Sequence, residues 1–187
     1  SARGERNFII YNPPVVDASL GLRKSAIHES VRLARDLLMY DIQSVVFARS
    51  RRSVEIVLKY LQESGGVERE PNGRVFRPDQ SVLRGYRSGY LPSERREIEK
   101  GLRDGSVRLV VATNALELGI DIGGLGAAVL LGYPGTIASV WQQSGRAGRG
   151  DVPAVSVLVA TPNPLDQFLA HHTEYFFSRS PEQALIN

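Results

Sequence analysis

The sequence contains no cysteine. Disulfides, cysteine nucleophiles and thiolate zinc sites all need that side chain, so this chain excludes all three. No apolar run approaches the roughly 18 residues that a membrane-spanning helix requires, and the first residues are polar rather than signal-like. We therefore expect a cytoplasmic setting and no membrane partner.

Lysine is almost as scarce, because 20 of the 23 basic residues are arginines. The planar guanidinium fork suits phosphate groups, although a GC-rich genome would produce the same bias. The net charge of +3 is too small to indicate a nucleic-acid partner by itself. Three histidines, of which His171 and His172 are adjacent, do not have the spacing of a metal site, so we predict no metal ligands here.

The phosphate-binding loop of nucleotide hydrolases is also missing. Residues 21–25 include Lys24 and Ser25 but lack the glycine before the lysine, and no Asp-Glu-x-His follows any predicted strand. The glycines at 124–126 fail as a dinucleotide fingerprint, because Val129 occupies the third glycine position and the run precedes its strand. The chain alone is therefore not expected to hydrolyse ATP, and a Rossmann-like small-molecule enzyme is disfavoured.

Apolar runs and helical periods alternate along the 187 residues, which are enough for one domain with a real core. This alternation predicts an α/β fold with a parallel sheet covered on both faces and ligands at the carboxyl ends of its strands. Residues 65–80 are polar and indicate a loop or hairpin insertion. The predicted strands are 7–11, 44–48, 82–83, 107–112, 127–131 and 155–160, and the predicted helices are 25–40, 53–63, 92–103, 136–146 and 165–177.

One octad, residues 142–149, has the pattern Q-x-x-G-R-x-G-R. If this segment is helical, Gln142 and Arg146 are i,i+4 neighbours, and Arg149 extends their face. Two guanidiniums and an amide suit a transferring phosphoryl group, whose spread negative charge a positioned arginine stabilises. The alternative interpretation is a solvated, arginine-bearing helix end that a glycine terminates.

The octad and four other segments resemble known motifs. Residues 113–121 (TNALELGID) together with 142–149 resemble motifs V and VI of superfamily 2 helicases, the DEAD/DEAH-box and RecQ-like group. Residues 45–55 are similar to motif IV of that group, and 89–102 to the region before motif V. The segments Tyr11-Asn12-Pro13-Pro14 and Trp141-Gln142-Gln143 resemble the YprA/MrfA type of DNA helicase.

The resemblance implies that residues 1–187 form the second of two RecA-like domains. In such helicases ATP with Mg²⁺ is bound mainly by the first RecA-like domain, here a partner from the same full-length chain. The positions of the motifs make Arg146 and Arg149 arginine fingers and place Gln142 near the γ-phosphate. Gly119 would let the backbone approach the nucleotide, and Asp121 would contact the ribose, although a structural turn acid is the alternative for Asp121.

A second group of residues is expected to hold nucleic acid. Thr113 and Asn114 follow one predicted strand, and Arg49 and Ser50 follow another, so their polar groups suit phosphates without reading sequence. Ser50 is equally suited to cap the next helix. Arg87 would meet a phosphate or a stacked base, or be an ordinary surface arginine.

These observations predict the second motor domain of an ATP-dependent helicase (EC 3.6.4 type), acting on DNA in repair as the branch resemblance implies. The alternative is a stand-alone nucleic-acid-binding or regulatory module without ATPase activity. ATP-facing arginines disfavour this alternative, because a protein that only binds nucleic acid gains little from them.

Overall fold

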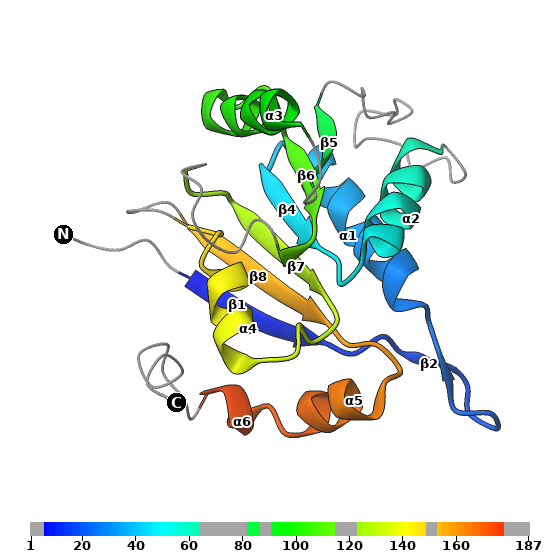
Figure 1. Cartoon of the computed structure of the whole chain (residues 1–187). Coiled ribbons are helices and arrows are strands. Elements are labelled where there is room, and N and C mark those ends of the chain that lie inside the picture. The colour runs from blue at the N-terminus through cyan, green and yellow to red at the C-terminus, as the bar shows by residue number, and fades with distance from the viewer. Residues whose placement is uncertain (1–5, 64–81, 87–90, 115–122, 149–152, 178–187) are drawn as a thin grey trace.

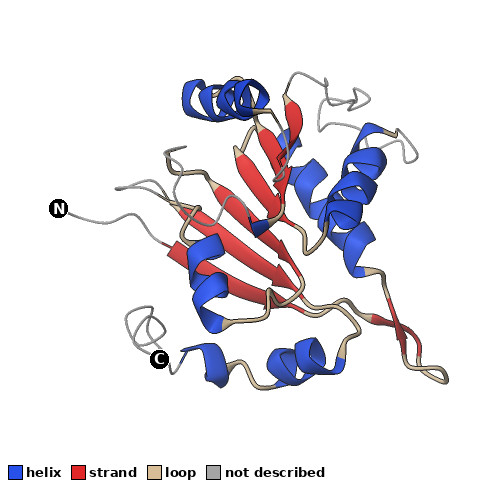
Figure 2. Cartoon of the chain, in the orientation of Figure 1, coloured by secondary structure: helices blue, strands red, loops and turns tan. Residues whose placement is uncertain are grey.

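The protein, seen as a computed structural model, is described for residues 6–63, 82–86, 91–114, 123–148 and 153–177. These residues form a six-stranded sheet in the order β1-β8-β7-β4-β6-β5, with helices on both faces (Figures 1 and 2). Every pairing in this sheet is parallel, as the sequence predicts. The strands are β1 (Arg6–Tyr11), β4 (Ser44–Phe47), β5 (Leu83–Tyr86), β6 (Leu109–Ala112), β7 (Ala127–Leu131) and β8 (Ala154–Val159).

The three strands β7, β4 and β6 are buried along their whole length. Apart from Ser44, all their residues are apolar, because helices cover both faces and leave no polar side to the sheet. On one face pack α1 (Ala26–Met39) and α2 (Arg51–Gln62). The other face is covered by α3 (Pro92–Asp104), α4 (Ile137–Ser144), α5 (Pro164–His171) and α6 (Glu174–Phe177).

Helix ends account for most differences from the predicted bounds. α2 begins at Arg51 rather than at residue 53, because Ser50 is its N-cap. α4 ends at Ser144, two residues before the predicted end. The helix predicted over 165–177 is divided at His172, which is the C-cap of α5. The predicted 65–80 insertion lies outside the described residues.

A short hairpin was not predicted. It consists of β2 (Val15–Asp17) and β3 (Leu22–Arg23), which pair antiparallel and project beyond the carboxyl end of β1 (Figure 1). Its turn forms because the Asp17 carboxylate accepts hydrogen bonds from the backbone N–H groups of Ser19 and Leu20, both at 3.1 Å. Strands of three and two residues are too short to show a period in the sequence.

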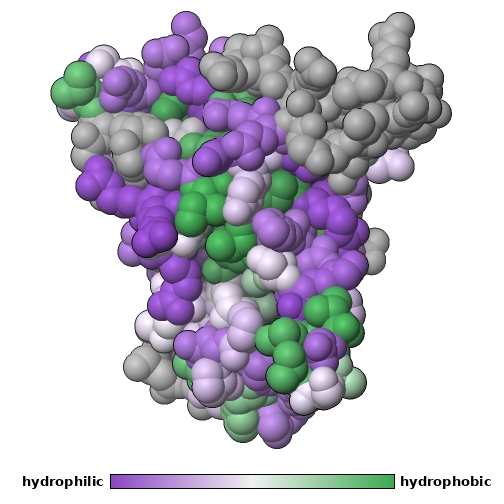
Figure 3. Space-filling view, turned by 90° about the vertical axis from the view of Figure 1, so that its right-hand side faces the viewer, coloured by the Kyte–Doolittle hydropathy of each residue, from purple (hydrophilic) through white to green (hydrophobic). Residues whose placement is uncertain are grey.

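The described residues include no helix that is both long enough and apolar enough to span a bilayer. Figure 3 faces the side toward which the hairpin projects and shows hydrophobic patches among mostly hydrophilic residues.

Candidate functional site

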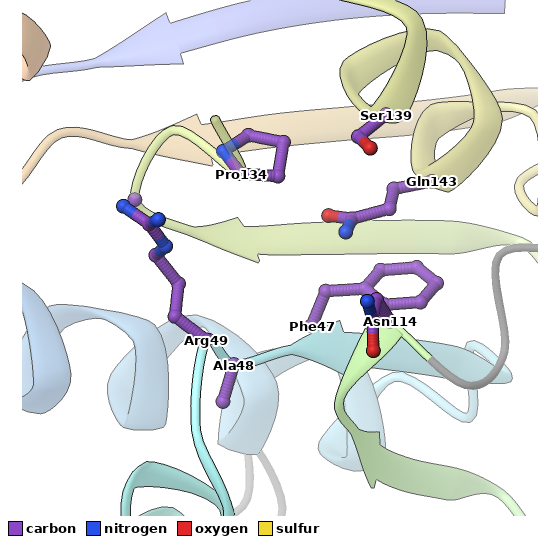
Figure 4. Close-up of a pocket in the computed structure, with 8 residues that line it drawn as sticks. Phe47, Ala48, Arg49, Asn114, Pro134, Ser139 and Gln143 are labelled. Carbon is purple, nitrogen blue, oxygen red and sulfur yellow. The ribbon is translucent and has the colours of Figure 1, made fainter. Parts of the chain in front are cut away.

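A crevice opens where the chain leaves two neighbouring strands in opposite directions. After β4 it turns to α2 on one face of the sheet, and after β7 it turns to α4 on the other. Ligands of open α/β sheets bind at such switch points. A cavity of about 250 Å³ lies here, and it is lined by Phe47, Ala48, Arg49, Asn114, Gly132, Pro134, Ser139 and Gln143 (Figure 4).

Arg49 comes directly after β4 and extends along the loop that follows β7 (Figure 4). A Cβ built on Gly132 would lie 3.7 Å from its Cδ, and one on Gly135 would lie 3.9 Å from its Nη2. The side chain is exposed, and within the described parts of the chain its guanidinium forms no hydrogen bond or ion pair. Its donors are therefore directed to solvent at the mouth of the cavity, where an anionic ligand would meet them.

The loop after β7, which lines the cavity with Gly132 and Pro134, is held in place by a buried carboxylate on α5. Asp166 accepts hydrogen bonds from Thr161 N at 2.9 Å, Thr161 Oγ1 at 2.8 Å and Tyr133 N at 3.3 Å. Gly132 beside it has a φ of +85°, and a Cβ there would lie 3.0 Å from Thr161 Cγ2. The turn after β7 therefore needs glycine, and Asp166 joins it to the end of β8.

The other predicted strand-end residues divide into two groups. Asn114 is exposed and lines the cavity with Arg49, because β4 and β6 are neighbours and Ala48 N donates to Ala112 O at 2.8 Å. Thr113 is half-buried and does not line the cavity. Ser50 does not line it either, since its Oγ accepts a hydrogen bond from Ser53 N at 3.1 Å. The helix-cap interpretation of Ser50 is thus confirmed.

Two lining residues on α4 were not predicted. Ser139 and Gln143 lie one turn apart on the face of α4 that meets the sheet, with Gln143 opposite Phe47 and Asn114 (Figure 4). Gln143 is buried, whereas its neighbour Gln142, which the prediction chose, is half-buried and lies outside this lining. The i,i+4 spacing of 139 and 143 beside buried Val140 is the sequence signal that would have identified them.

The end of the octad lies at the opposite edge of the sheet. Arg146 O accepts from Leu125 N at 3.0 Å, and Gly148 N donates to Leu125 O at 2.7 Å, which places these residues before the start of β7. Arg146 N donates to Gln143 O, so the segment has left the α-helix and the predicted i,i+4 geometry of Gln142 and Arg146 is wrong. Arg146 is half-buried, and this burial lowers the pKa of its guanidinium.

Gly148 has a packing role in this arrangement. Its φ is +92°, and a Cβ there would lie 3.0 Å from Ala154 Cβ and 3.1 Å from Arg6 Nε. Arg6 Nη2 also donates to Gly148 O at 3.1 Å. The second glycine of the octad is therefore needed for the backbone turn itself. The predicted site residues Arg87, Gly119, Asp121 and Arg149 lie outside the described residues.

The cavity lined by Arg49 therefore lies at the carboxyl edge of the sheet, and an arginine-bearing turn lies at the amino edge. Residues 25–151 match the helicase conserved C-terminal domain family. The chain belongs to this family. The match spans both edges, from the N-cap of α1 to the end of the octad, and agrees with the resemblance to superfamily 2 helicases.

Individual relatives place the chain with the YprA/MrfA type. It is 50% identical over 184 residues to the ATP-dependent helicase YprA of Bacillus subtilis, a match that covers 98% of this chain and 23% of YprA. A crystal structure of the DUF1998 helicase MrfA bound to DNA is similar, with 49% identity, a TM-score of 0.85, and coverage of 96% of this chain and 23% of that one. A crystal structure of MrfA bound to DNA and AMPPNP is also similar, with 49% identity and a TM-score of 0.81. This match covers 93% of this chain and 23% of that one.

These likenesses confirm a RecA-like sheet and the C-terminal domain of ATP-dependent superfamily 2 helicases. The chain spans about a quarter of the length of YprA and of MrfA. The helicase activity for which these longer relatives are named is therefore a proposal for this chain.

Proposed function

We propose that this chain is the second motor domain of an ATP-dependent DNA helicase that acts in repair. It would hold the phosphates of one strand at its carboxyl edge and bring positive charge to ATP that the first RecA-like domain binds. The observation that carries the proposal is the convergence of Arg49 and Asn114 on one cavity at the switch point. A cation and an amide there grip a backbone without reading its bases.

The nucleotide side has fewer described residues but a consistent chemistry. Arg146 is partly dehydrated, and its pKa is lowered for that reason, so an anionic partner stabilises its charged form. Gln142, half-buried on the last turn of α4, adds an amide. Together with Arg149, which the motif pattern assigns to the same task, Gln142 and Arg146 would suit the far end of a triphosphate. The motifs assign Gly119 to close backbone approach and Asp121 to the ribose. Bound ATP would supply the free energy for movement along the strand.

DNA as the strand is supported by the DNA-bound MrfA structures. Repair as the process is supported only by the resemblance to the YprA/MrfA type. The stand-alone binding module remains the competing function, and the arginine-bearing turn is the feature that argues against it.

The strand-binding half is tested in the full-length protein by Arg49→Ala, with Arg96→Ala as the control, an exposed arginine on α3. Arg49→Ala should weaken binding of every single-stranded sequence alike and lower the slope of log affinity against log salt by about 0.7, the value for one lost phosphate contact. Arg96→Ala should leave both unchanged. A loss confined to particular sequences would contradict a backbone grip.

The nucleotide half is tested by Arg146→Ala and Arg149→Ala. Each should lower strand-stimulated ATP turnover by orders of magnitude, as removal of a positioned arginine does, while strand binding stays within about twofold of wild type. Unchanged turnover in both variants would favour the stand-alone module. The chain of 187 residues by itself is expected to show no turnover.

A further inference from the structure

A second cavity of about 450 Å³ adjoins the first at the carboxyl edge of the sheet. Arg49 lines both, so the two cavities meet at its side chain. The second cavity lies between the start of α1, the start of α2 and the ends of β7 and β8. Its lining consists of Arg23, Lys24, Ser25, Ala26, Ile27, Arg49, Ser53, Leu131, Thr161 and Pro162.

The rim of this cavity is basic. Arg23, Lys24 and Arg49 contribute three cations, and Ser53 and Thr161 add hydroxyl groups. The floor is different, because buried Leu131 and half-buried Ile27 present only apolar atoms from their side chains. A basic rim over an aliphatic floor fits a nucleotide unit, with its phosphate at the rim and its flat base on the floor. The volume is within the range of small-ligand sites.

Arg23 and Lys24, at the base of the hairpin, both form hydrogen bonds with the chain that follows β1. Arg23 Nη1 donates to Pro13 O at 2.9 Å, and Lys24 N donates to Pro14 O at 2.9 Å. One guanidinium nitrogen of Arg23 is thus anchored. The other N–H groups of this guanidinium have no acceptor among the described residues. The base of the hairpin therefore holds the Arg23 guanidinium and the Lys24 backbone where both residues line the cavity.

The ammonium group of Lys24 forms only a long, solvent-exposed ion pair with the protein. Its Nζ lies 4.0 Å from Glu29 Oε1, and its side chain is 56% exposed. Glu29 already accepts hydrogen bonds from Arg32 Nε at 2.7 Å and from the Tyr11 hydroxyl at 3.2 Å. Burial would raise the pKa of Glu29, but these partners outweigh burial and hold that pKa below its ordinary value. Lys24 therefore remains a cation available to a phosphate.

We propose that the strand held at Arg49 continues into this second cavity, where Arg23 and Lys24 bind the next phosphate and the apolar floor takes its base. This inference rests on the proposed function and extends the path of the strand. An aliphatic floor offers no hydrogen bonds to base edges, so the cavity accepts any base. The ligand is single-stranded nucleic acid.

The test uses the full-length protein and labelled oligothymidylates of increasing length. Lys24→Ala should lower affinity several-fold for long oligonucleotides and should reach its plateau of affinity at a shorter length than wild type does. The salt slope for long oligonucleotides should fall by about 0.7. Binding of the shortest oligonucleotides should not change, because they need only the first cavity.

Three controls accompany Lys24→Ala. Lys59→Ala removes a lysine that is also largely exposed and has a similar long ion pair, 3.8 Å to Glu63, at the far end of α2, and it should change nothing. Lys24→Arg keeps the charge and should restore the affinity and the plateau length of wild type. Arg49→Ala should weaken binding at every length.

The outcomes separate this inference from the proposed function. If Arg49→Ala weakens binding and Lys24→Ala does not, the strand grip stands and the second cavity is no part of the path. If neither variant matters, both are wrong. If Lys24→Ala leaves strand binding intact but raises the KM for ATP, or the inhibition constant of inorganic phosphate, the cavity takes a free anion and the inference is overturned.

Discussion

At the scale of single residues, Asp166 decides the shape of the first cavity without lining it. Its carboxylate is 2% exposed and joins the loop after β7 to the end of β8 through three hydrogen bonds. Buried carboxylates are tolerated when such bonds satisfy them. No motif marks this aspartate in the sequence, because its partners are two backbone groups and a hydroxyl that only the fold brings together.

Asp166→Ala should lower the free energy of unfolding by about 3 kcal/mol, because it leaves buried donors without an acceptor. Asp166→Asn keeps one carbonyl oxygen in place and should cost clearly less. Urea denaturation of both variants measures the difference. Equal losses would mean that the hydrogen bonds of Asp166 contribute little to the loop.

Tyr86 provides a test by pH. Burial, helped by the hydrogen bond that its hydroxyl donates to Glu99 Oε1 at 3.0 Å, raises the pKa of Tyr86 to about 12 from its ordinary 10.0. A pKa raised by folding stabilises the fold below pH 10, and this contribution is lost as pH rises from 10 to 12, at about 1.4 kcal/mol per unit.

Tyr86→Phe removes the titrating group and should therefore lose less stability than wild type between pH 10 and 12. Urea denaturation across that range measures both proteins. Parallel losses would show that the hydroxyl does not titrate abnormally.

At the scale of elements, the N-terminus of α2 combines a structural and an electrostatic role. Ser50 caps the helix through Ser53 N, and it lies next to Arg49 at the carboxyl edge. The cap and the proposed grip can be separated, because aspartate caps helices as well as serine does but carries a negative charge.

Ser50→Ala should destabilise the chain by about 1 kcal/mol. Ser50→Asp should keep that stability yet weaken strand binding by the full-length protein, since a carboxylate beside Arg49 repels phosphate. Thermal unfolding and fluorescence anisotropy give the two values. Unweakened binding by Ser50→Asp would place the strand away from α2.

The long helices and strands could be predicted from the sequence, but only some of the side chains that meet in the folded chain could. The sheet was predictable because β4, β6 and β7 are nearly uninterrupted apolar runs, and Asn114 met Arg49 because their strands end at one edge. The hairpin was missed because its strands are two and three residues long. Gln143 was not predicted because the octad pattern begins at Gln142, although the spacing of Ser139, Val140 and Gln143 on one helix face indicates which amide faces the sheet.

At the scale of the whole molecule, the two proposed functional regions lie at opposite edges of the sheet. The cavity follows the ends of β4, β6 and β7, and the turn from Arg146 to Gly148 precedes the start of β7. A substitution in the turn should therefore affect nucleotide chemistry without affecting the strand.

Gly148→Ala should cost about 1–3 kcal/mol for its left-handed backbone, with a further cost from crowding against Ala154. ATP turnover by the full-length protein should fall while strand affinity stays intact. Gly105→Ala is the matched control: its φ is +82°, but a Cβ there would meet only Arg108 Nη1, at 3.5 Å. Turnover that falls equally in both variants would point to general destabilisation.

The placement of α4 has a mechanical consequence. Its eight residues form a stiff rod of roughly 12 Å, with Ser139 and Gln143 lining the first cavity and Arg146 two residues beyond its C-terminal end. A helix this short tilts as a rigid unit, so a movement at one residue also moves the residues at its ends. If the proposed strand binds there, any displacement that it imposes on Gln143 would also reorient the Arg146 guanidinium three residues later, and strand binding would then control the rate of ATP hydrolysis.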